Sequence, residues 1–191
     1  MDKKQAIFEA AAYLFARKSY EGTGIRDISS RAGVNSAMIS YYYGGKKKLL
    51  IEIFKTYAAL LLSVARTAVA EAETVEKFCN IAVRAITLLA RENYDVFMTG
   101  MSIKKNNDPE LFEINEQLNE NFKQLNIDLR DKYSLNLSLD PLDLDVFGSA
   151  TLSMTLSHFL LGGDLEDDEY FEKYIELITP LVTAVFNHYK N

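Results

Sequence analysis

Apolar residues recur at helical spacing along nearly the whole chain, and no stretch shows sustained alternation with a period of two. Only three prolines and nine glycines interrupt the 191 residues. Strand-rich chains need the alternating pattern and frequent turn signals, so this pattern predicts an all-α fold. Hydrophobic residues make up 48% of the chain, which is enough to bury a core.

We expect about nine helices, with ends marked by capping residues, prolines and glycines. Asp108 and Asp140 each precede a proline, which suits the first helical position because its missing N–H is not needed there. Pro180 should kink the last helix. The first predicted helix ends at residues 17–18, and the others cover 25–32, 36–43, 46 to the late sixties, 75–91, about 96–103, 109–132, 141–161 and 167–189.

Charge is distributed unevenly along the chain, whose formal net charge is -6. Residues 1–48 carry nine basic and four acidic side chains, and the remainder carries 12 basic and 23 acidic ones. This uneven distribution of charge suggests a basic domain that binds a polyanion, joined to an acidic domain with a different function. We therefore divide the chain into a basic domain, residues 1–48, and a larger helical domain, residues 49–191.

The cysteine content and the N-terminus point to a cytoplasmic protein without a metal or other cofactor. Cys79 is the single cysteine, which excludes an intrachain disulfide or a cysteine-rich metal site. The N-terminal residues lack the apolar core of a signal peptide. The uncharged stretch 146–163 contains several serines and threonines, so we interpret it as a buried helix and not a membrane span.

Two short helices joined at Gly33 predict a helix-turn-helix, since glycine permits the sharp turn while Ile28, Val34 and Ile39 bury the corner. The exposed positions of the second of these helices are short or uncharged, and basic side chains flank it. A helix that reads the major groove needs side chains that fit base edges, with cations beside it for the phosphates. On these features alone, a helical corner with solvated lysines is the alternative.

A wider stretch, residues 6–54, reads AIFEAAAYLFARKSYEGTGIRDISSRAGVNSAMISYYYGGKKKLLIEIF. It resembles the DNA-binding domain of the TetR family of bacterial transcriptional regulators almost position for position. The resemblance implies a repressor that binds a pseudo-palindromic operator as a homodimer. It also implies an all-helical C-terminal domain that dimerises through its last two long helices and often encloses a pocket for a small inducer.

The resemblance also implies which residues contact DNA. One residue of the second helix can reach a base or phosphate, the third helix carries the recognition face, and its end and the start of the fourth helix contact the backbone. The set comprises Thr23, Arg26, Asn35, Ser36, Ala37, Met38, Ser40, Tyr41, Tyr42 and Lys46.

Several positions depart from the family pattern. Gly24 replaces a capping Ser or Thr, at a cost of only a few tenths of a kcal/mol, and Ser40 replaces a tyrosine that can contact a thymine methyl. Tyr43 takes a position that is usually a buried Phe, so its hydroxyl needs a partner. Lys47 and Lys48 replace common acids, which should raise phosphate affinity without adding sequence information.

For the dimer interface we expect two stripes on the last two helices. Small residues recur every fourth position on one helix, which allows close approach, and bulky residues line the other. Packing of both stripes inside one subunit is the alternative. The predicted interface comprises Ser149, Ser153, Ser157, Tyr174, Ile178, Val182, Val185 and Tyr189.

A surplus of soft and aromatic residues between the fifth and eighth helices predicts a pocket for an apolar or aromatic effector. Ordinary core packing is the alternative for each of these residues. The predicted lining comprises Tyr94, Phe97, Met98, Met101, Phe112, Phe122, Thr151, Met154 and His158, together with Phe159.

Two other function classes remain open. An enzyme is disfavoured because the chain has no glycine-rich phosphate loop and no serine nucleophile elbow, and because Cys79 lies among apolar neighbours. His158 and His188 lack metal-ligand spacing. A helical interaction adaptor without sequence-specific DNA binding is the other alternative, and salt-dependent binding to duplex DNA separates it from a regulator.

Overall fold

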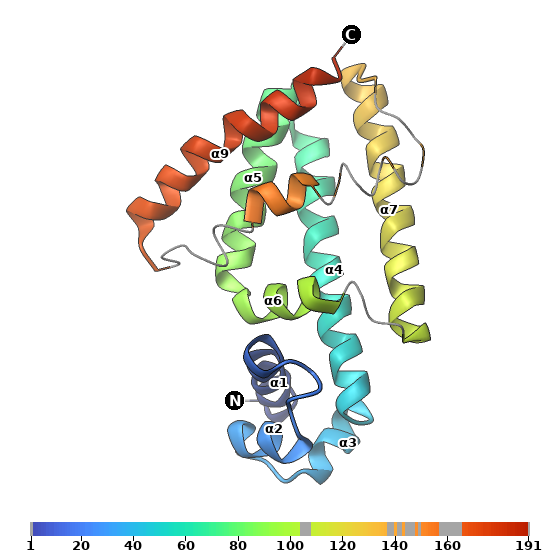
Figure 1. Ribbon diagram of the computed structural model, residues 1–191, viewed down its shortest axis with the longest axis vertical. Coiled ribbons are helices and arrows are strands. Elements are labelled where there is room, and N and C mark those ends of the chain that lie inside the picture. Colours follow the sequence, from blue (N-terminus) through green and yellow to red (C-terminus); the bar gives the residue numbers. More distant parts are fainter. Residues whose placement is uncertain are drawn as a thin grey trace. The chain divides into compact units, whose positions relative to one another are not determined.

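The computed structural model describes residues 2–103, 108–136, 140, 143, 148, 150–156 and 166–190. In this part of the chain all regular structure is helical, apart from an isolated bridge between Leu135 and Lys190 (Figure 1). The prediction of an all-α fold is confirmed. The helices are α1 (Lys3–Lys18), α2 (Ile25–Ala32), α3 (Ala37–Tyr43), α4 (Lys46–Glu71), α5 (Val75–Glu92), α6 (Tyr94–Ile103), α7 (Pro109–Tyr133) and α9 (Asp168–His188), and residues 150–156 are also helical.

The predicted helix ends agree with these bounds to within one or two residues, because the caps act locally. Asp108 accepts hydrogen bonds from the N–H groups of Glu110 (3.0 Å) and Leu111 (3.4 Å) at the start of α7. Asp167 does the same for Glu169 and Tyr170 at the start of α9. The predicted helix 141–161 lies partly outside the described residues. Among the described residues, no helix is both long enough and apolar enough to cross a bilayer.

Two compact units make up the chain: Met1–Ala59 with Asn93–Asn115, and Leu60–Glu92 with Glu116–Asn191. We call them the head and the body. The head contains α1, α2, α3, the first part of α4, α6 and the start of α7. The body contains the rest of α4, α5, most of α7 and α9.

The head has a core built from one apolar face of each helix. Ile7, Ile28, Ile39 and Leu49, from α1 to α4, are completely buried. Further along the chain, α6 packs against α1, and the buried Thr99 hydroxyl donates to the carbonyl of Ala12 at 3.3 Å.

Inside the head, α6 also packs very closely against α4. The ring of Tyr57 meets the ring of Phe97 edge-on at 5.4 Å between centroids, and both side chains are buried. A Cβ atom on Gly100 would lie 2.3 Å from Cγ of Tyr57, so a glycine is required for this approach.

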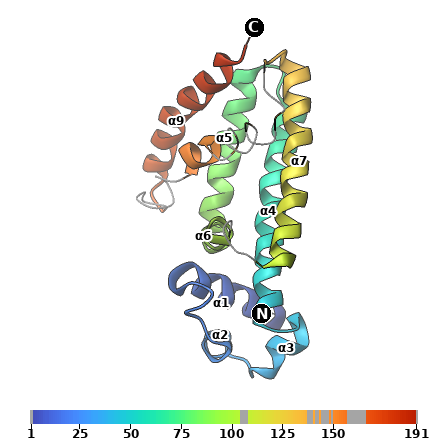
Figure 2. The same cartoon turned by 45° about the vertical axis from the view of Figure 1, so that its right-hand side comes forward.

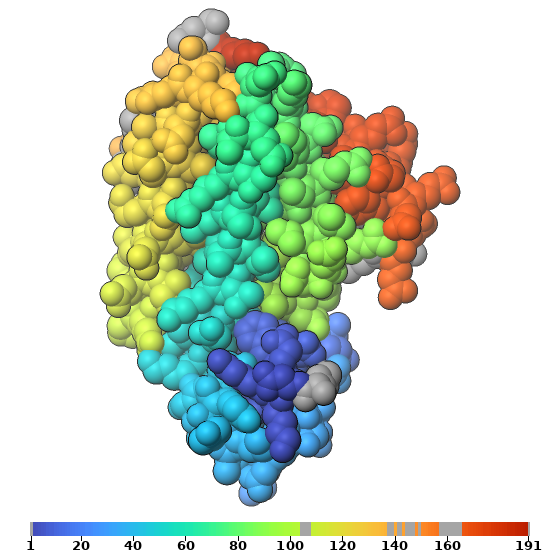
Figure 3. All heavy atoms as spheres, turned by 180° about the vertical axis from the view of Figure 1, so that it is seen from behind, coloured from blue at the N-terminus to red at the C-terminus, as the bar shows by residue number. Residues whose placement is uncertain are grey.

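In the body, α4 lies between α5 and α7, as the ribbon and space-filling views agree (Figures 2 and 3). The hydroxyl of Tyr133 on α7 donates to the carbonyl of Ala72, which follows α4, at 2.9 Å. On the other side, α9 packs against α5 with the rings of Phe78 and Phe186 5.4 Å apart. Arg84 and Glu172 join the same two helices through two hydrogen bonds of 2.8 and 2.7 Å.

Candidate nucleic-acid interface

The turn between α2 and α3 has the geometry that the sequence predicts. Gly33 ends α2 with φ of 65° and ψ of 34°, the left-handed conformation that glycine adopts without strain. The N–H of Val34 donates to the carbonyl of Ser29 at 3.0 Å. Ile28 and Ile39 on the two helices are completely buried. The helix-turn-helix is therefore formed inside the head.

The first turn of α3 is fixed by two side-chain hydrogen bonds. Asn35 caps the helix by accepting from the N–H of Ala37 at 2.9 Å. The hydroxyls of Ser36 and Ser29 lie 2.9 Å apart and form a hydrogen bond between α3 and α2. Sequence reasoning placed Ser36 on the recognition face, whereas its hydroxyl in this structure links the two helices.

At the start of α2, Asp27 compensates for the missing side chain of Gly24. Its carboxylate accepts from the N–H of Gly24 at 2.8 Å, so one exposed backbone donor is satisfied from inside the helix. The capping acid also lies in the first turn, where the helix dipole favours negative charge.

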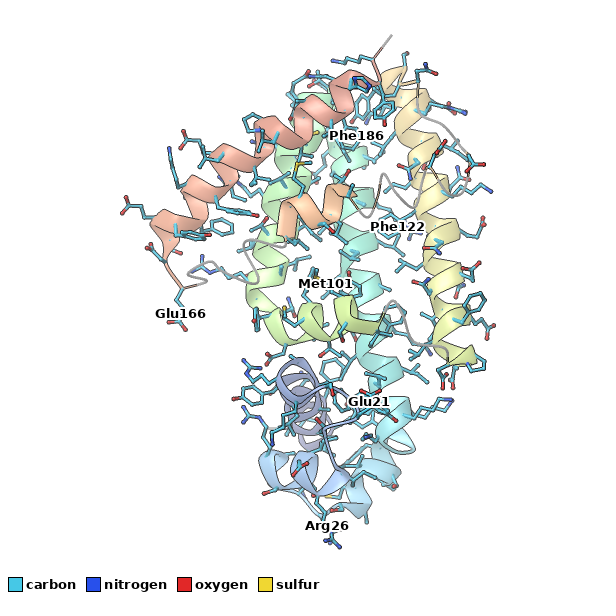
Figure 4. All side chains as sticks on the ribbon, viewed as in Figure 1. Glu21, Arg26, Met101, Phe122, Glu166 and Phe186 are labelled. Atoms are coloured by element: carbon cyan, nitrogen blue, oxygen red, sulfur yellow. The ribbon has the colours of Figure 1, made fainter. Side chains whose placement is uncertain are left out.

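The remaining predicted recognition residues form an accessible surface on the head. Arg26, Asn35, Ala37 and Ser40 are exposed, and Met38 and Tyr42 are half-buried. Tyr41 is 81% exposed, and its ring meets that of Tyr42 edge-on at 5.0 Å. Figure 4 shows Arg26 extending away from the ribbon. Short, uncharged side chains thus lie beside a cation, as a base-reading helix requires.

Thr23 and Lys46 each donate hydrogen bonds to backbone carbonyls. Thr23 is 1% exposed, and its hydroxyl donates to the carbonyl of Ser19 at 2.8 Å. The ammonium of Lys46 donates to the carbonyls of Tyr20 and Thr23, each at 2.9 Å. It also lies 4.0 Å from the centroid of the Tyr20 ring. Both residues are therefore engaged with the loop between α1 and α2.

Lys47 and Lys48 are paired with acids at the start of α7. The Nζ of Lys47 lies 2.7 Å from Asp108, and the Nζ of Lys48 lies 2.6 Å from Glu110. The hydrogen bond from Lys47 lowers the pKa of Asp108, and the same bond raises the pKa of Lys47. These pairs lie in the head, so the two lysines are partly neutralised within their own unit.

The hydroxyl of Tyr43 has a hydrogen-bond partner, as the sequence predicts. It donates to the carbonyl of Lys4 at 2.8 Å, which ties the end of α3 to the start of α1. Burial, with smaller contributions from Glu52 and Asp2, raises the pKa of Tyr43 to about 12. The phenol therefore stays protonated and can donate this bond throughout the neutral range.

Sequence reasoning missed a stack of two arginines on one aromatic ring. The guanidinium carbons of Arg31 and Arg17 lie 3.2 and 3.7 Å from the centroid of the Tyr13 ring. Arg17 also forms an ion pair with Asp95 of α6. Tyr13 and Arg17 lie one helical turn apart on α1, so the sequence could have predicted their contact. Arg31 is distant in sequence and reaches the ring only because of the tertiary structure.

The predicted pocket residues fall in both units. Tyr94, Met98 and Met101 are half-buried on α6, where Phe97 is buried against Tyr57, and all four belong to the head. Phe112, also in the head, is 62% exposed. The body holds the half-buried side chains of Phe122, Thr151 and Met154. His158 and Phe159 lie outside the described residues.

Part of the predicted dimer stripe contacts the subunit's own core. Tyr174 and Val182 are 6% and 3% exposed, and the Tyr174 hydroxyl donates to the carbonyl of Thr155 at 3.1 Å. Ile178, Val185 and Tyr189 are half-buried. Ser153 is exposed, whereas Ser149 and Ser157 lie outside the described residues.

A different apolar stripe of α9 faces outward. Leu177 and Leu181 are 58% and 55% exposed, and Pro180 and Ala184 between and beside them are exposed too. These four residues form what we call the outer stripe of α9. Such a contiguous apolar surface is typical of a protein interface.

The geometry of the head agrees with that of a known family. The family model described as bacterial regulatory proteins, tetR family, matches residues 7–53. A solved structure, the fatty acid degradation regulator FadR from Bacillus halodurans, superposes with a TM-score of 0.72 at 18% identity, covering 96% of this chain and 95% of that one. Residues 7–53 of this chain therefore match the DNA-binding domain of the TetR family, and the chain shares its fold with a solved regulator of fatty acid degradation.

Two curated relatives are similar to this chain over different lengths. The protein named "Probable HTH-type transcriptional regulator YttP" of Bacillus subtilis is 39% identical over 66 residues, which cover 32% of this chain and 32% of the relative. The HTH-type transcriptional repressor KstR2 of Mycolicibacterium smegmatis is 20% identical over 187 residues, covering 95% and 91%. TetR-family members are DNA-binding transcriptional regulators and not enzymes, so the enzyme alternative is set aside.

Proposed function

We propose that this protein is a transcriptional repressor that binds a pseudo-palindromic operator as a homodimer in the cytoplasm. The observation that carries the proposal is the surface of α3. Its capped first turn exposes Ala37 and Ser40, with Arg26 alongside, and leaves room for base edges to approach. One such helix reads only a few base pairs, so two copies are needed for a specific site.

The basic side chains that remain accessible supply the attraction to phosphates. Arg26 extends from α2, and Tyr13 holds the exposed Arg31 in place. Arginine suits this task because its planar group stacks on an aromatic ring and still donates to phosphate oxygens. Tyr41, the most exposed of the large apolar side chains named above, lies where it can pack against the DNA backbone.

The test is operator selection followed by disruption of its symmetry. Purified protein is footprinted on genomic DNA, and affinity is measured for the selected site, for a variant with one half-site scrambled and for a variant with both scrambled. The proposal predicts half-sites about one helical turn apart, ~34–36 Å, and loss of tight binding when one is scrambled. Equal affinity for all three duplexes would favour the adaptor alternative.

We propose that the outer stripe of α9 forms the homodimer interface. Leu177 and Leu181 lie one helical turn apart and remain accessible after the subunit has packed its own core. Two copies of the stripe meeting across a two-fold axis would each cover the other's apolar surface. The expected small-residue helix can still contribute through Ser153, whose side chain is exposed.

We propose further that a small apolar or aromatic ligand releases the repressor from DNA. The half-buried Phe122 and Met154 of the body offer an apolar lining, and Thr151 offers a polar group to orient a ligand. The structural relative FadR is named as a regulator of fatty acid degradation, which supports testing fatty acids alongside aromatic acids. Release is limited by the ligand's differential affinity for the two states, typically ~1–3 kcal/mol.

A matched pair of substitutions tests this ligand response. Met154→Trp should fill part of the proposed ligand site and abolish the response while operator affinity stays intact. Asn119→Trp is the control, because that side chain is exposed on α7, a helix of the body that carries no residue of the proposed dimer interface. An unchanged response in Met154→Trp would remove this residue from the ligand site, and a ligand panel that never shifts operator affinity would argue for control by another signal.

A further inference from the structure

The sequence Lys46-Lys47-Lys48 starts α4 directly after the recognition helix and the two glycines that end it, where three cations suggest phosphate contacts. In the structure each ammonium already has partners within the head. The ammonium groups of Lys47 and Lys48 pair with acids at the surface, whereas the ammonium of Lys46 bonds to backbone carbonyls. Lys46 is therefore the member of the run whose bonds control the shape of the backbone.

The segment that Lys46 contacts is the loop between α1 and α2. Ser19 starts it with φ of 63°, a left-handed conformation that a non-glycine residue adopts at some cost. Gly22 is needed there, because a Cβ atom would lie 2.1 Å from the carbonyl oxygen of Lys18. Such a loop lacks the repeating hydrogen bonds of a helix, so its carbonyls need partners from elsewhere.

Lys46 supplies such partners. An ammonium has three N–H donors, and two of them reach the carbonyls of Tyr20 and Thr23. The Nζ of Lys46 also lies 4.0 Å from the centroid of the Tyr20 ring. A cation at this distance is attracted to the face of the ring. A phosphate contact through these donors would require the loop to give up its bonds.

The same loop determines where the recognition helix lies. It ends at Gly24, from which α2 starts, and α2 is joined to α3 through the Ser29–Ser36 hydrogen bond and the Gly33 turn. Tyr43 then ties the end of α3 back to α1. A shift of the loop would move α2 and, through these links, the side chains of α3.

We propose that Lys46 is a positioning residue that holds the α1–α2 loop in place and so orients the recognition helix, rather than a residue that contacts DNA phosphates. The inference rests on the proposed operator binding. It makes a distinct claim about specificity: removing the Lys46 ammonium should weaken operator binding more than binding to unrelated duplexes.

The dependence of affinity on salt separates the two roles. Each phosphate contact contributes about 0.9 to the slope of log affinity against log salt concentration. Lys46→Met, which keeps an unbranched stem and loses the charge, should lower operator affinity about tenfold, the equivalent of about one charge-assisted hydrogen bond. It should leave non-specific affinity and the salt slope close to those of Lys77→Met, a control with the same change in net charge at an exposed lysine of the body.

A slope that falls by about one unit relative to Lys77→Met, with operator and unrelated DNA weakened alike, would show that Lys46 binds a phosphate and would overturn the proposal. No loss of operator affinity would overturn it as well. A wild-type protein that binds no duplex specifically would instead refute the proposed function, and the next measurement would still test the loop contact.

Lysine acylation footprinting of the wild-type protein requires no variant to fold. Free and DNA-bound protein are treated with a small acylating reagent, and modification of each lysine is followed by mass spectrometry. Lys46 should react much more slowly than Lys3 in the free protein, because its nitrogen is engaged, and DNA should not protect it further. Rapid modification that DNA suppresses would contradict the proposal.

Removal of the aromatic partner gives an independent check. Tyr20→Leu should reproduce part of the loss of operator affinity, again without a change in salt slope, and the double variant with Lys46→Met should lose less than the sum of the two. Additive losses would mean that the two side chains act separately, which would overturn the loop mechanism. Circular dichroism verifies that each variant remains folded.

Discussion

Several single side chains in the head join its helices and loops through hydrogen bonds to backbone atoms that are distant in sequence. Tyr43 bonds the carbonyl of Lys4, Lys46 bonds those of Tyr20 and Thr23, and Thr99 bonds that of Ala12. Each bond joins segments that could otherwise shift against each other. The positions of the helices in the head therefore depend on a few polar groups as well as on its apolar core.

Substitution of Tyr43 by Phe measures one of these bonds. The ring and its contact with Lys4, whose Nζ lies 5.7 Å from the ring centroid, should remain. The carbonyl of Lys4 can turn to water because that residue is exposed, so the free energy of unfolding should fall by only about 0.5–1.5 kcal/mol. Urea unfolding checks the value, and a loss above about 3 kcal/mol would show that the hydroxyl does more than link α3 to α1.

Gly100 offers a steric test inside the head. Alanine there places a Cβ atom 2.3 Å from Cγ of the buried Tyr57 ring, so α6 or the ring must shift. The strain of overpacking, about 1–3 kcal/mol, should outweigh the gain of roughly 1 kcal/mol in helix propensity. Thermal unfolding should show a lower midpoint for Gly100→Ala, but not for the control Gly148→Ala, where a Cβ atom meets nothing within 4 Å.

At the scale of secondary-structure elements, the start of α7 acts on the charge of the head. Asp108 and Glu110 lie in its cap and first turn and neutralise Lys47 and Lys48 on α4. Exposed ion pairs of this kind contribute little to stability, so DNA phosphates can compete for the lysines. The acids therefore reduce the electrostatic attraction between the head and DNA.

The double variant Asp108→Asn, Glu110→Gln tests this effect. Asparagine still caps the helix, so α7 should stay intact. Two freed lysines should raise non-specific DNA affinity and make the salt slope steeper by up to about two units. Fluorescence anisotropy over a salt series measures both, with Glu113→Gln, Glu116→Gln as the control of equal charge change, and an identical slope in the two double variants would contradict the competition.

The sequence predicted the elements well where the signal is local. Gly33 and Asn35 mark the turn and the cap through their own backbone and side-chain preferences, and the structure confirms both. The faces of α9 were harder to assign, because apolar residues lie on most sides of it. Val182 is buried and its neighbour Leu181 is exposed, and only the packing against α5 distinguishes them.

The same reason explains which site residues sequence reasoning could not interpret. Ser36 and Lys46 have the residue types and positions of DNA contacts, but their partners Ser29, Tyr20 and Thr23 come from other segments. A pattern along one chain shows which atoms can form bonds. Which bonds form depends on the tertiary structure.

At the scale of the whole molecule, the outer stripe of α9 predicts the oligomeric state. Leu177→Glu with Leu181→Glu should give monomers, because two charges would be buried in the interface without partners. Both side chains are more than half exposed, so the subunit itself should remain folded. Sedimentation velocity measures the mass, Phe112→Glu serves as the control at an exposed apolar position of α7, and a persistent dimer would move the interface elsewhere.

Acid should destabilise the protein through carboxylates that are paired in the folded state. Arg84 lowers the pKa of Glu172, and Lys47 lowers that of Asp108. A carboxylate with a lowered folded pKa stabilises the protein above its unfolded pKa, about 4, and this stabilisation is lost as the pH falls through the folded pKa. The difference in urea midpoint between wild type and Glu172→Gln should therefore be largest near pH 7 and shrink toward pH 3, whereas a difference independent of pH would contradict the assignment.

The division of α4 and α6 between the units has a consequence for hybrid regulators. Leu49, Phe54 and Tyr57 belong to the core of the head, although they follow the matched DNA-binding helices along α4, and α6 joins the same unit from residue 93 onward. A fusion that takes only residues 1–48 from this protein would replace these core residues with foreign side chains. The helices that carry the DNA-reading surface would then pack on a different core. A recombinant that transfers the operator preference intact has to exchange two separate pieces of the gene, encoding residues 1–59 and 93–115, in one step.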